Sequence, residues 1–398
     1  MKFPVLYLRK GAERRLRAGH LWVYSNEVDT RRSPLGDFEA GCQAELRSAV
    51  DKPLGTVFVN PHTLICARLI SRDPAHGMTP QRLAQRMEQA LSLRTRLFEE
   101  PFYRWVFGDS DGLSGLVIDR FGDVVVVQIS TAGMEQMKDA VIRTVQRLAH
   151  PATIVVKNDG KMRGVEGLPQ YTETALGSEP DLLRVRENEV EFEVPLSGGQ
   201  KTGWFYDHRM NRRRLQAYAS GKRVLDVFSY VGGWGLQAAV AGASRVTCVD
   251  SSGAALDSVH HNARLNRLDN VETLEGDAFA ALKALCDERE KYDIVVLDPP
   301  ALIPRRRDQK AGEQAYARLN QLGLRLLDRD GLLVSASCSM HLSQDKLVDI
   351  IRGSGRKIDR FVQLLEQGHQ APDHPVIPGI PETDYIKACF VRSLTGFF

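Results

Sequence analysis

The chain has 398 residues, and its 53 lysines and arginines against 50 aspartates and glutamates give a formal net charge of +3. A hydrophobic content of 43% and a charged content of 26% are typical of globular proteins, and the length favours two or three domains. No apolar run approaches the roughly 20 residues that span a bilayer, and residues 1–10 do not resemble a signal peptide, so we expect a cytoplasmic protein. The six cysteines form no CxxC pair, which argues against a disulfide framework or a structural zinc site.

The first 75 residues have the texture of a small β-barrel or sandwich. Short alternating apolar runs are broken by turn residues, which is the pattern of short antiparallel strands. The expected strands lie near residues 21–24, 44–47, 55–60 and 64–70.

Residues 76–195 are expected to form an α+β middle domain, entered through a polar linker at residues 71–77. Helical spacing of apolar residues and one hairpin signal define its elements. They are a helix over about 80–98, a hairpin within 116–129 that turns at Phe121-Gly122-Asp123, a helix over 134–148 and a strand at 153–157.

Residues 196–398 alternate strand and helix patterns, which predicts an α/β domain with a doubly wound, mainly parallel sheet of the Rossmann-like kind. The expected strands are 223–228, 245–250, 271–275, 293–297, 332–336 and 388–392, and the expected helices are 235–241, 254–266, 278–287, 313–327 and 343–352.

The first strand-to-helix turn of this domain is rich in glycine, with Gly232, Gly233 and Gly235 allowing tight turning and close approach of a ligand. The GxGxxG pattern of dinucleotide sites is absent. Asp226 lies inside the preceding strand, where a carboxylate suits the cationic end of a ligand better than a pyrophosphate. Asp250 ends the second strand and is placed to accept hydrogen bonds from ribose hydroxyls.

This series of side chains fits a zwitterionic nucleoside, so S-adenosylmethionine is the expected cofactor. Asp277 and its apolar neighbour follow the third strand and suit the edge and face of an adenine, although Asp277 could equally be a helix cap. The expected cofactor contacts are Asp226, Phe228, Tyr230, Gly232, Gly233, Asp250, Asp277, Ala278 and Asp298.

Asp298-Pro299-Pro300 and Ser337-Cys338-Ser339 each follow an apolar, strand-like run. Ligands of open α/β sheets bind at the carboxyl ends of the strands, so a carboxylate and a thiol delivered there can reach one substrate atom. A thiolate at Cys338 that adds to C6 of cytosine makes C5 nucleophilic toward a methyl donor, and Asp298 is expected to hydrogen-bond or protonate the base edge. The alternatives are a buried cysteine at a strand end and a turn that merely ends a strand.

Basic residues cluster at 14–17, 212–214 and 305–307. Any one cluster is ordinarily a solvated face, but three of them, one next to the Asp298 motif, favour a polyanionic partner such as RNA. The expected substrate contacts are Pro299, Pro300, Arg209, Arg305 and Arg306.

Nearly the whole chain resembles the PUA-domain-bearing RNA 5-methylcytosine methyltransferases that act on large-subunit ribosomal RNA. The matching segments are Lys10 to Tyr24, Asp109 to Asp123 and Gln200 to Arg209. The resemblance implies a PUA-like RNA-binding domain, a middle domain and a Rossmann-like methyltransferase domain, with the catalytic cysteine at Cys338 and the Asp-Pro-Pro motif at Asp298. Two positions depart from the family pattern, which often has Gln at His208 and Lys at Ala301.

Three other functions stay open. Asp-His-Arg at residues 207–209 resembles a related group that methylates guanine in the same RNA, but that group lacks the cysteine motif, and Ala301 cannot stack on a base. A non-catalytic RNA-binding assembly factor would have no need for four aspartates at the strand ends. A small-molecule methyltransferase would not need some 195 residues of additional domains. A homodimer through apolar edges of the middle domain is also left open.

Overall fold

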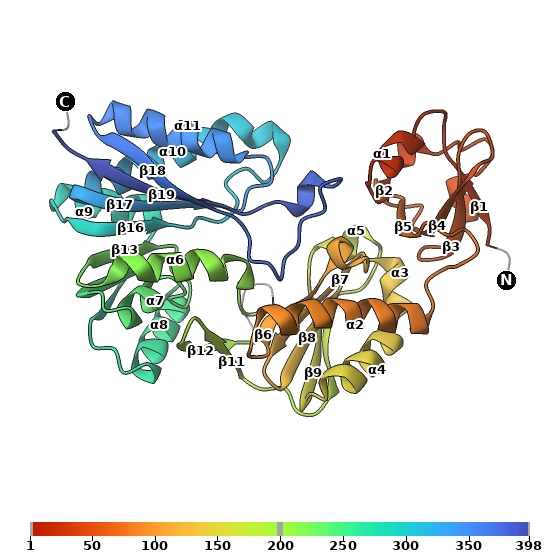
Figure 1. Cartoon of the computed structure of the whole chain (residues 1–398), viewed down its shortest axis with the longest axis horizontal. Coiled ribbons are helices and arrows are strands. Elements are labelled where there is room, and N and C mark those ends of the chain that lie inside the picture. The colour runs from red at the N-terminus through yellow and green to blue at the C-terminus, as the bar shows by residue number, and fades with distance from the viewer. Residues whose placement is uncertain (1–2, 197–201, 397–398) are drawn as a thin grey trace. The chain divides into compact units, whose positions relative to one another are not determined.

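The computed structural model describes residues 3–196 and 202–396, so Gln200 and Lys201 of the segment quoted above lie outside the described residues. The chain divides into two compact units (Figure 1), each of which is built from several separate stretches of sequence. The N-terminal unit comprises Met1–Leu183, Pro195–Trp204 and Pro372–Thr383, and the C-terminal unit comprises Arg184–Val194, Phe205–Ala371 and Asp384–Phe398.

The first sheet of the N-terminal unit has five strands in the order β1-β3-β4-β5-β2. Buried and half-exposed residues alternate along β3, where Ala44 and Leu46 face the core and their neighbours are half exposed, as expected for a strand with one buried face. This confirms the expected small β-structure. The elements are β1 (Val5–Tyr7), α1 (Glu13–Arg17), β2 (Trp22–Val23), β3 (Gln43–Arg47), β4 (Pro53–Val59) and β5 (Ala67–Ser71).

The second sheet has the order β10-β9-β8-β7-β6, with helices α2 and α4 packed against one another and contributing to its hydrophobic core. Helix α4 is the crossover between the parallel strands β8 and β9. The elements are α2 (Pro80–Leu97), β6 (Phe102–Phe107), β7 (Leu116–Phe121), β8 (Val124–Ile129), α3 (Ala132–Glu135), α4 (Lys138–Ala149), β9 (Thr153–Asn158), α5 (Met162–Val165) and β10 (Tyr171–Leu176).

A buried ionic network fixes the distant segment Pro372–Thr383 within the N-terminal unit. Arg94 pairs with Asp111 through two hydrogen bonds of 2.6 and 2.8 Å and also donates to the backbone oxygen of Asp373 at 2.6 Å. Arg104 pairs with Asp119, and its backbone N–H donates to the Asp373 carboxylate at 3.0 Å. Two acidic residues of the 109–123 motif therefore hold the arginines that bind this returning segment.

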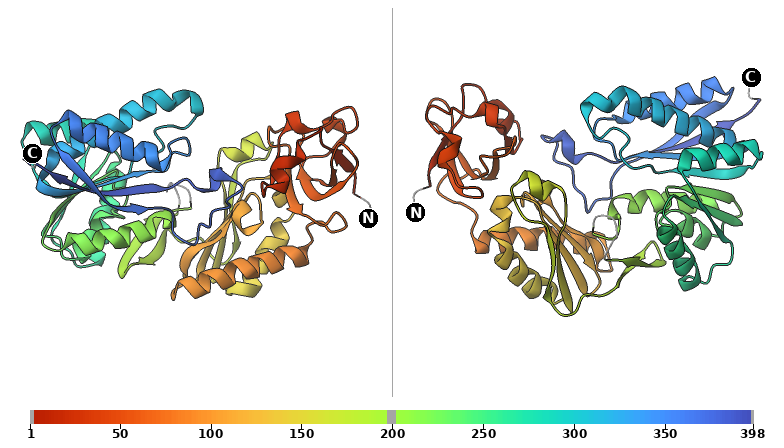
Figure 2. Two further views of the ribbon diagram at one scale, coloured as in Figure 1. Left: turned by 45° about the horizontal axis from the view of Figure 1, so that its top comes forward. Right: turned by 180° about the vertical axis from the view of Figure 1, so that it is seen from behind.

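The C-terminal unit contains a seven-stranded sheet in the order β15-β14-β13-β16-β17-β19-β18. Strands β13 to β17 are parallel, and β19 runs antiparallel between β17 and β18. Helices α6, α7 and α8 lie on one face, and α9, α10 and α11 lie on the other (Figures 1 and 2). The doubly wound sheet that the sequence predicts is confirmed.

The elements of this unit begin with a hairpin of β11 (Leu182–Glu187) and β12 (Val190–Pro195). They continue with α6 (Arg209–Ala219), β13 (Arg223–Val227), α7 (Gly235–Val240), β14 (Arg245–Asp250), α8 (Gly253–Leu265), β15 (Val271–Glu275), α9 (Ala278–Asp287), β16 (Tyr292–Leu297), α10 (Gln309–Leu326), β17 (Leu327–Ser337), α11 (Gln344–Lys357), β18 (Phe361–Gly368) and β19 (Lys387–Leu394).

Several features differ from the sequence-based expectation. The expected elements do not include strands β1, β6, β10 and β18, the β11–β12 hairpin, or helices α1, α5 and α6. Residues Arg184–Val194 group with the C-terminal unit, although the predicted boundary lies at residue 195, and the division into three domains stays a prediction. Within the described part of the chain, the helices are all too short or too polar to cross a bilayer.

Candidate active site at the carboxyl ends of the C-terminal sheet

The turn after β13 has an unusual backbone. Phe228 and Tyr230 have φ angles of 66° and 51°, in the left-handed region that aromatic residues rarely adopt, and Gly232 has a φ of 89°. The N–H groups of Phe228 and Ser229 both donate to the backbone oxygen of Val249, which fixes the turn on the end of β14. Such local strain is characteristic of ligand-binding turns.

Gly235, the first residue of α7, permits very close packing of this helix on the sheet. A Cβ atom at this position would lie 2.7 Å from the Cys248 sulfur of β14. The Gly235 N–H donates to one carboxylate oxygen of Asp226 at 2.8 Å. The start of α7 is therefore fixed directly above the acidic side chain of β13.

Asp226 is fully buried, and burial raises its pKa to about 7. The hydrogen bond from Gly235 opposes this shift, whereas the charges of Asp298 and Asp250 add to it. Its second carboxylate oxygen has no hydrogen-bond partner among the residues that the structure describes. A buried acceptor without a partner, next to a strained glycine-rich turn, fits the cationic end of S-adenosylmethionine.

Asp250 ends β14 with both carboxylate oxygens oriented by backbone donors. One oxygen accepts from the Tyr230 N–H at 2.9 Å and the other from the Ser252 N–H at 3.0 Å. Each oxygen has a further lone pair, so the group is held ready to accept ribose hydroxyls. Asp277, by contrast, is exposed and caps α9 by accepting from the Ala280 N–H at 3.0 Å, while Ala278 is buried.

Asp298 follows β16 and contacts two aromatic side chains from distant parts of the sequence. The indole N–H of Trp234 donates to one carboxylate oxygen at 2.9 Å, and Nε2 of His208 lies 3.4 Å from the other. Burial tends to raise the Asp298 pKa, but the charge and hydrogen bond of His208 and the hydrogen bond of Trp234 outweigh it and lower the pKa below its usual value. Asp298 is therefore an anion at neutral pH.

The position of the proton on His208 follows from the residues around Asn211. The amide oxygen of Asn211 accepts from Arg214 at 3.0 Å, and its NH₂ group donates to the His369 backbone oxygen at 3.1 Å, which fixes the orientation of the amide. The same NH₂ group lies 3.1 Å from Nδ1 of His208. In neutral His208, Nδ1 is thus the acceptor and Nε2 carries the proton toward Asp298. Sequence reasoning missed this pair, because only the 207–209 motif marks His208.

Cys338 follows β17, half buried, with its sulfur 3.9 Å from the backbone oxygen of Pro299. The flanking Ser337 and Ser339 are fully buried, and both accept or donate a hydrogen bond with the Tyr316 hydroxyl, at 2.8 and 2.9 Å. The structure thus brings the cysteine loop and the Asp298 loop together, as the sequence predicts. Pro299 is buried and Pro300 is exposed.

The basic clusters differ in their surroundings. Arg305 and Arg306 are exposed in the loop that follows the Asp298 motif. Arg209 and Arg212, however, are buried and form ion pairs with Glu187 of the β11–β12 hairpin. The guanidinium group of Arg209 thus neutralises a buried carboxylate inside the fold, and a substrate contact at Arg209 stays a prediction.

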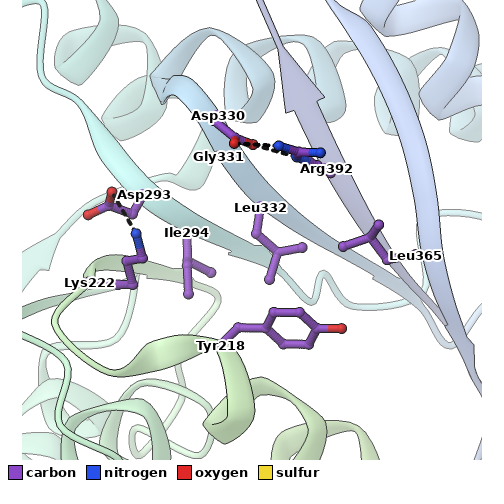
Figure 3. Close-up of a pocket in the computed structure, with 9 residues that line it drawn as sticks. All are labelled: Tyr218, Lys222, Asp293, Ile294, Asp330, Gly331, Leu332, Leu365 and Arg392. Carbon is purple, nitrogen blue, oxygen red and sulfur yellow. Dashed lines mark hydrogen bonds and ion pairs between the residues drawn. The ribbon is translucent and has the colours of Figure 1, made fainter.

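A pocket of about 180 Å³ lies at the opposite end of the same sheet (Figure 3). Ile294, Leu332, Leu365 and the ring of Tyr218 form its apolar part, between the Lys222–Asp293 and Arg392–Asp330 ion pairs. Along β17, Leu332 is six residues from Cys338, or about 20 Å at the rise of an extended strand. This pocket is therefore separate from the candidate active site.

Comparisons with known proteins show which family the chain belongs to. Residues 108–382 match the model of the family described as S-adenosylmethionine-dependent methyltransferase, and residues 6–72 match the PUA-like domain. Ribosomal RNA large subunit methyltransferase I of Klebsiella pneumoniae (strain 342) is 35% identical over 396 residues, with 98% of each chain covered. The protein of that name from Escherichia coli (strain K12) is 34% identical over 394 residues, covering 97% of this chain and 98% of the relative.

A solved structure from Streptococcus mutans, described as a proposed SAM-dependent methyltransferase, matches with a TM-score of 0.82 at 22% identity. It covers 98% of this chain and 100% of its own. A structure of a methyltransferase complexed with S-adenosylhomocysteine matches over the same shares with a TM-score of 0.83, also at 22% identity. At this identity the two structures support the fold. Together with the family match and the curated relatives, these findings show that the chain belongs to the S-adenosylmethionine-dependent methyltransferases and carries an N-terminal PUA-like domain.

Proposed function

We propose that this protein methylates C5 of a cytosine in large-subunit ribosomal RNA, 23S rRNA in bacteria, through a covalent adduct with Cys338. The observation that carries the proposal is the position of the Cys338 sulfur, 3.9 Å from the backbone oxygen of Pro299, the residue that follows Asp298 in the chain. A nucleophile and a group that binds the base edge are both needed for attack on an aromatic carbon. The names of the relatives and the PUA-like domain support RNA as the substrate.

The proposed reaction begins when the Cys338 thiolate adds to C6 of cytosine and forms an S–C6 bond. The electron pair of the C5=C6 bond becomes available at C5, which takes the methyl group. When bound, S-adenosylmethionine supplies that group from its sulfonium and leaves as S-adenosylhomocysteine. Transfer of the C5 proton to a base returns the electron pair to the C5=C6 bond, breaks the S–C6 bond and restores the Cys338 thiolate.

Asp298 acts in this scheme as a hydrogen-bond acceptor. Its lowered pKa keeps it ionised at neutral pH, and a carboxylate suits the exocyclic amino group of cytosine, which is a donor. The Trp234 indole donates to this carboxylate, and His208 Nε2 lies 3.4 Å from its other oxygen. The exposed Arg305 and Arg306 are proposed to contact RNA phosphates near the target base.

Transcripts that contain 5-fluorocytidine test the proposal. With fluorine in place of hydrogen at C5 there is no proton to remove, so the thiolate cannot be eliminated and the covalent adduct persists. We expect a protein–RNA species that survives denaturing electrophoresis with the wild-type enzyme and with Cys286→Ala, a matched half-buried cysteine of the same unit. Cys338→Ala should give no such species. A Cys338→Ala enzyme that still methylates RNA, with the product mapped to guanine, would support the guanine N-methyltransferase alternative. Absence of S-adenosylmethionine binding by calorimetry would instead favour the assembly factor.

A further inference from the structure

Three neighbouring elements hold the backbone around Cys338. Tyr316 of α10 contacts the hydroxyls of both flanking serines, and the Ile303 N–H donates to the Ser339 hydroxyl at 3.1 Å. Lys387, the first residue of β19, donates from Nζ to the Ser339 backbone oxygen at 2.8 Å. The cysteine is therefore fixed by α10, by the loop after the Asp298 motif and by β19.

Lys387 is a buried cation directly beside this loop. Its Cα is the register partner of Ser337 on the neighbouring strand, so its side chain starts one residue away from Cys338. The side chain is nearly fully buried, at 6% exposure. A buried ammonium group requires a compensating anion or several strong acceptors, and a backbone carbonyl alone compensates little of its charge.

We propose that Lys387 is a positioning residue whose ammonium group stabilises the thiolate form of Cys338, so that the nucleophile is ionised before RNA binds. The inference rests on the proposed role of Cys338 and adds the group that activates it. Attraction between two unit charges is several times stronger in a partly buried site than in water. A neighbouring lysine is one of the environments that lower the pKa of a reactive cysteine.

Other groups near Lys387 and Cys338 also affect the ionisation of these residues. Burial lowers the pKa of Lys387, while the charges of Asp384 and of the Cys338 thiolate act in the opposite direction and favour the ammonium form. Burial raises the pKa of Tyr316, and the Cys338 charge adds to this, so Tyr316 stays a neutral hydrogen-bond donor. Asp298, which is also an anion, precedes Pro299, whose backbone oxygen lies 3.9 Å from the Cys338 sulfur.

Alkylation of the full-length protein by iodoacetamide as a function of pH measures the thiol directly, with each cysteine followed by peptide mass spectrometry. We expect half-maximal reactivity of wild-type Cys338 below about pH 8.5, the value of a free cysteine. Lys387→Gln keeps a donor for the Ser339 oxygen but removes the charge, and should move this midpoint up by about one unit. Lys222→Gln, a matched change at the other end of the sheet, should leave the midpoint unchanged.

Cys286 is the internal reference, because burial raises its pKa and Lys387→Gln should not affect its reactivity. A Cys338 midpoint that is identical in wild type and Lys387→Gln would overturn the inference. If Lys387→Gln does not fold, a wild-type Cys338 midpoint at or above that of Cys286 overturns it equally. The experiment uses no RNA, so a low midpoint without a 5-fluorocytidine adduct would reject the proposed function and leave the activation of Cys338 by Lys387 standing.

Discussion

The two ends of the seven-stranded sheet treat charge in opposite ways. At the carboxyl ends, Asp226 and Lys387 are buried at 0% and 6% exposure. Burial raises the pKa of Asp226 and lowers the pKa of Lys387, which favours the neutral form of each. At the other end, Asp330 and Arg392 form a two-point ion pair with side-chain exposures of 55% and 43%. Exposed pairs add little to stability, whereas a buried charge destabilises a fold unless a partner of opposite charge or several hydrogen bonds compensate it. This difference agrees with the proposal that the carboxyl ends of the sheet hold the active site.

The largest effect should come from Cys338→Ala, which removes the proposed nucleophile. We expect methyl transfer to fall on the order of a thousandfold or more, because removal of a covalent nucleophile leaves only binding and electrostatic contributions. Affinity for S-adenosylmethionine should stay within a factor of about two, since Cys338 lies outside the glycine-rich turn. Single-turnover methylation and calorimetry measure the two quantities. Residual activity within tenfold of wild type would contradict the proposal that the carboxyl ends of the sheet supply the nucleophile.

Asp226→Asn should come second. Asn keeps an acceptor for the Gly235 N–H but lacks the charge, so S-adenosylmethionine binding at pH 8 should weaken about ten- to a hundredfold. Wild-type affinity should rise as the pH passes through about 7, where Asp226 ionises in the free protein, and the variant should lack this rise. Calorimetry between pH 6 and pH 8.5 provides the comparison, and equal pH dependence in both proteins would count against the role of Asp226.

The same carboxyl group makes a prediction about stability. The folded pKa of Asp226 is raised above that of the unfolded chain, so folding takes up a proton between about pH 4 and pH 7. Its contribution to stability is therefore full below pH 4 and is lost as the pH rises to 7. Thermal unfolding of the ligand-free protein should show Asp226→Asn gaining in melting temperature relative to wild type from pH 5 to pH 8. An unchanged difference across this range would show that Asp226 does not titrate there.

His208→Ala should have an intermediate effect, with methylation reduced about tenfold at pH 7 through loss of the imidazole whose Nε2 lies 3.4 Å from the Asp298 carboxylate. Because His208 lowers the Asp298 pKa, its removal raises that pKa, and the acid limb of the pH–rate profile should move to higher pH. His208→Gln keeps a donor for Asp298 and should recover most of the activity but not the full position of the acid limb. Identical profiles for all three proteins would argue that His208 is only a packing residue.

The smallest effect is expected at the exposed end of the sheet. Asp330→Asn breaks the pair with Arg392 on the surface, where solvent screens the interaction. We expect the melting temperature to change by less than about 3 °C and the methylation rate to stay at the wild-type value. Differential scanning calorimetry and a methylation assay suffice. A large loss of activity would show that the pocket of Figure 3 communicates with the active site.

The sequence predicts the central strands and their terminal acids well, because buried parallel strands are continuous apolar runs followed by polar residues. It fails where distant partners decide the structure. Helix α6 contains several arginines, and its sequence alone indicates only a basic cluster. The residue that neutralises Arg209 and Arg212 is Glu187, which lies in a hairpin some 20 residues earlier and is not visible in the local pattern. Strand β18 is an edge strand with mixed exposure and has no clear alternation.

The candidate site shows the same division between local and distant information. Asp226 and Cys338 could be predicted because each lies in or directly after an apolar run. The contact between His208 and Asp298 joins residues that are 90 positions apart and has no signature in either segment. The sequence cannot assign a single role to Asp277, because a polar residue that precedes a helix fits both a helix cap and a ligand contact.

The return of Pro372–Thr383 to the N-terminal unit has a practical consequence for dissecting this enzyme. We expect a single truncation to give no autonomous catalytic fragment, because any polypeptide that starts after residue 183 still carries a segment whose partners, Arg94 and Arg104, have been deleted. Conversely, an N-terminal fragment leaves these arginines without Asp373. Two halves produced as separate polypeptides should therefore become soluble and active only when they are synthesised together.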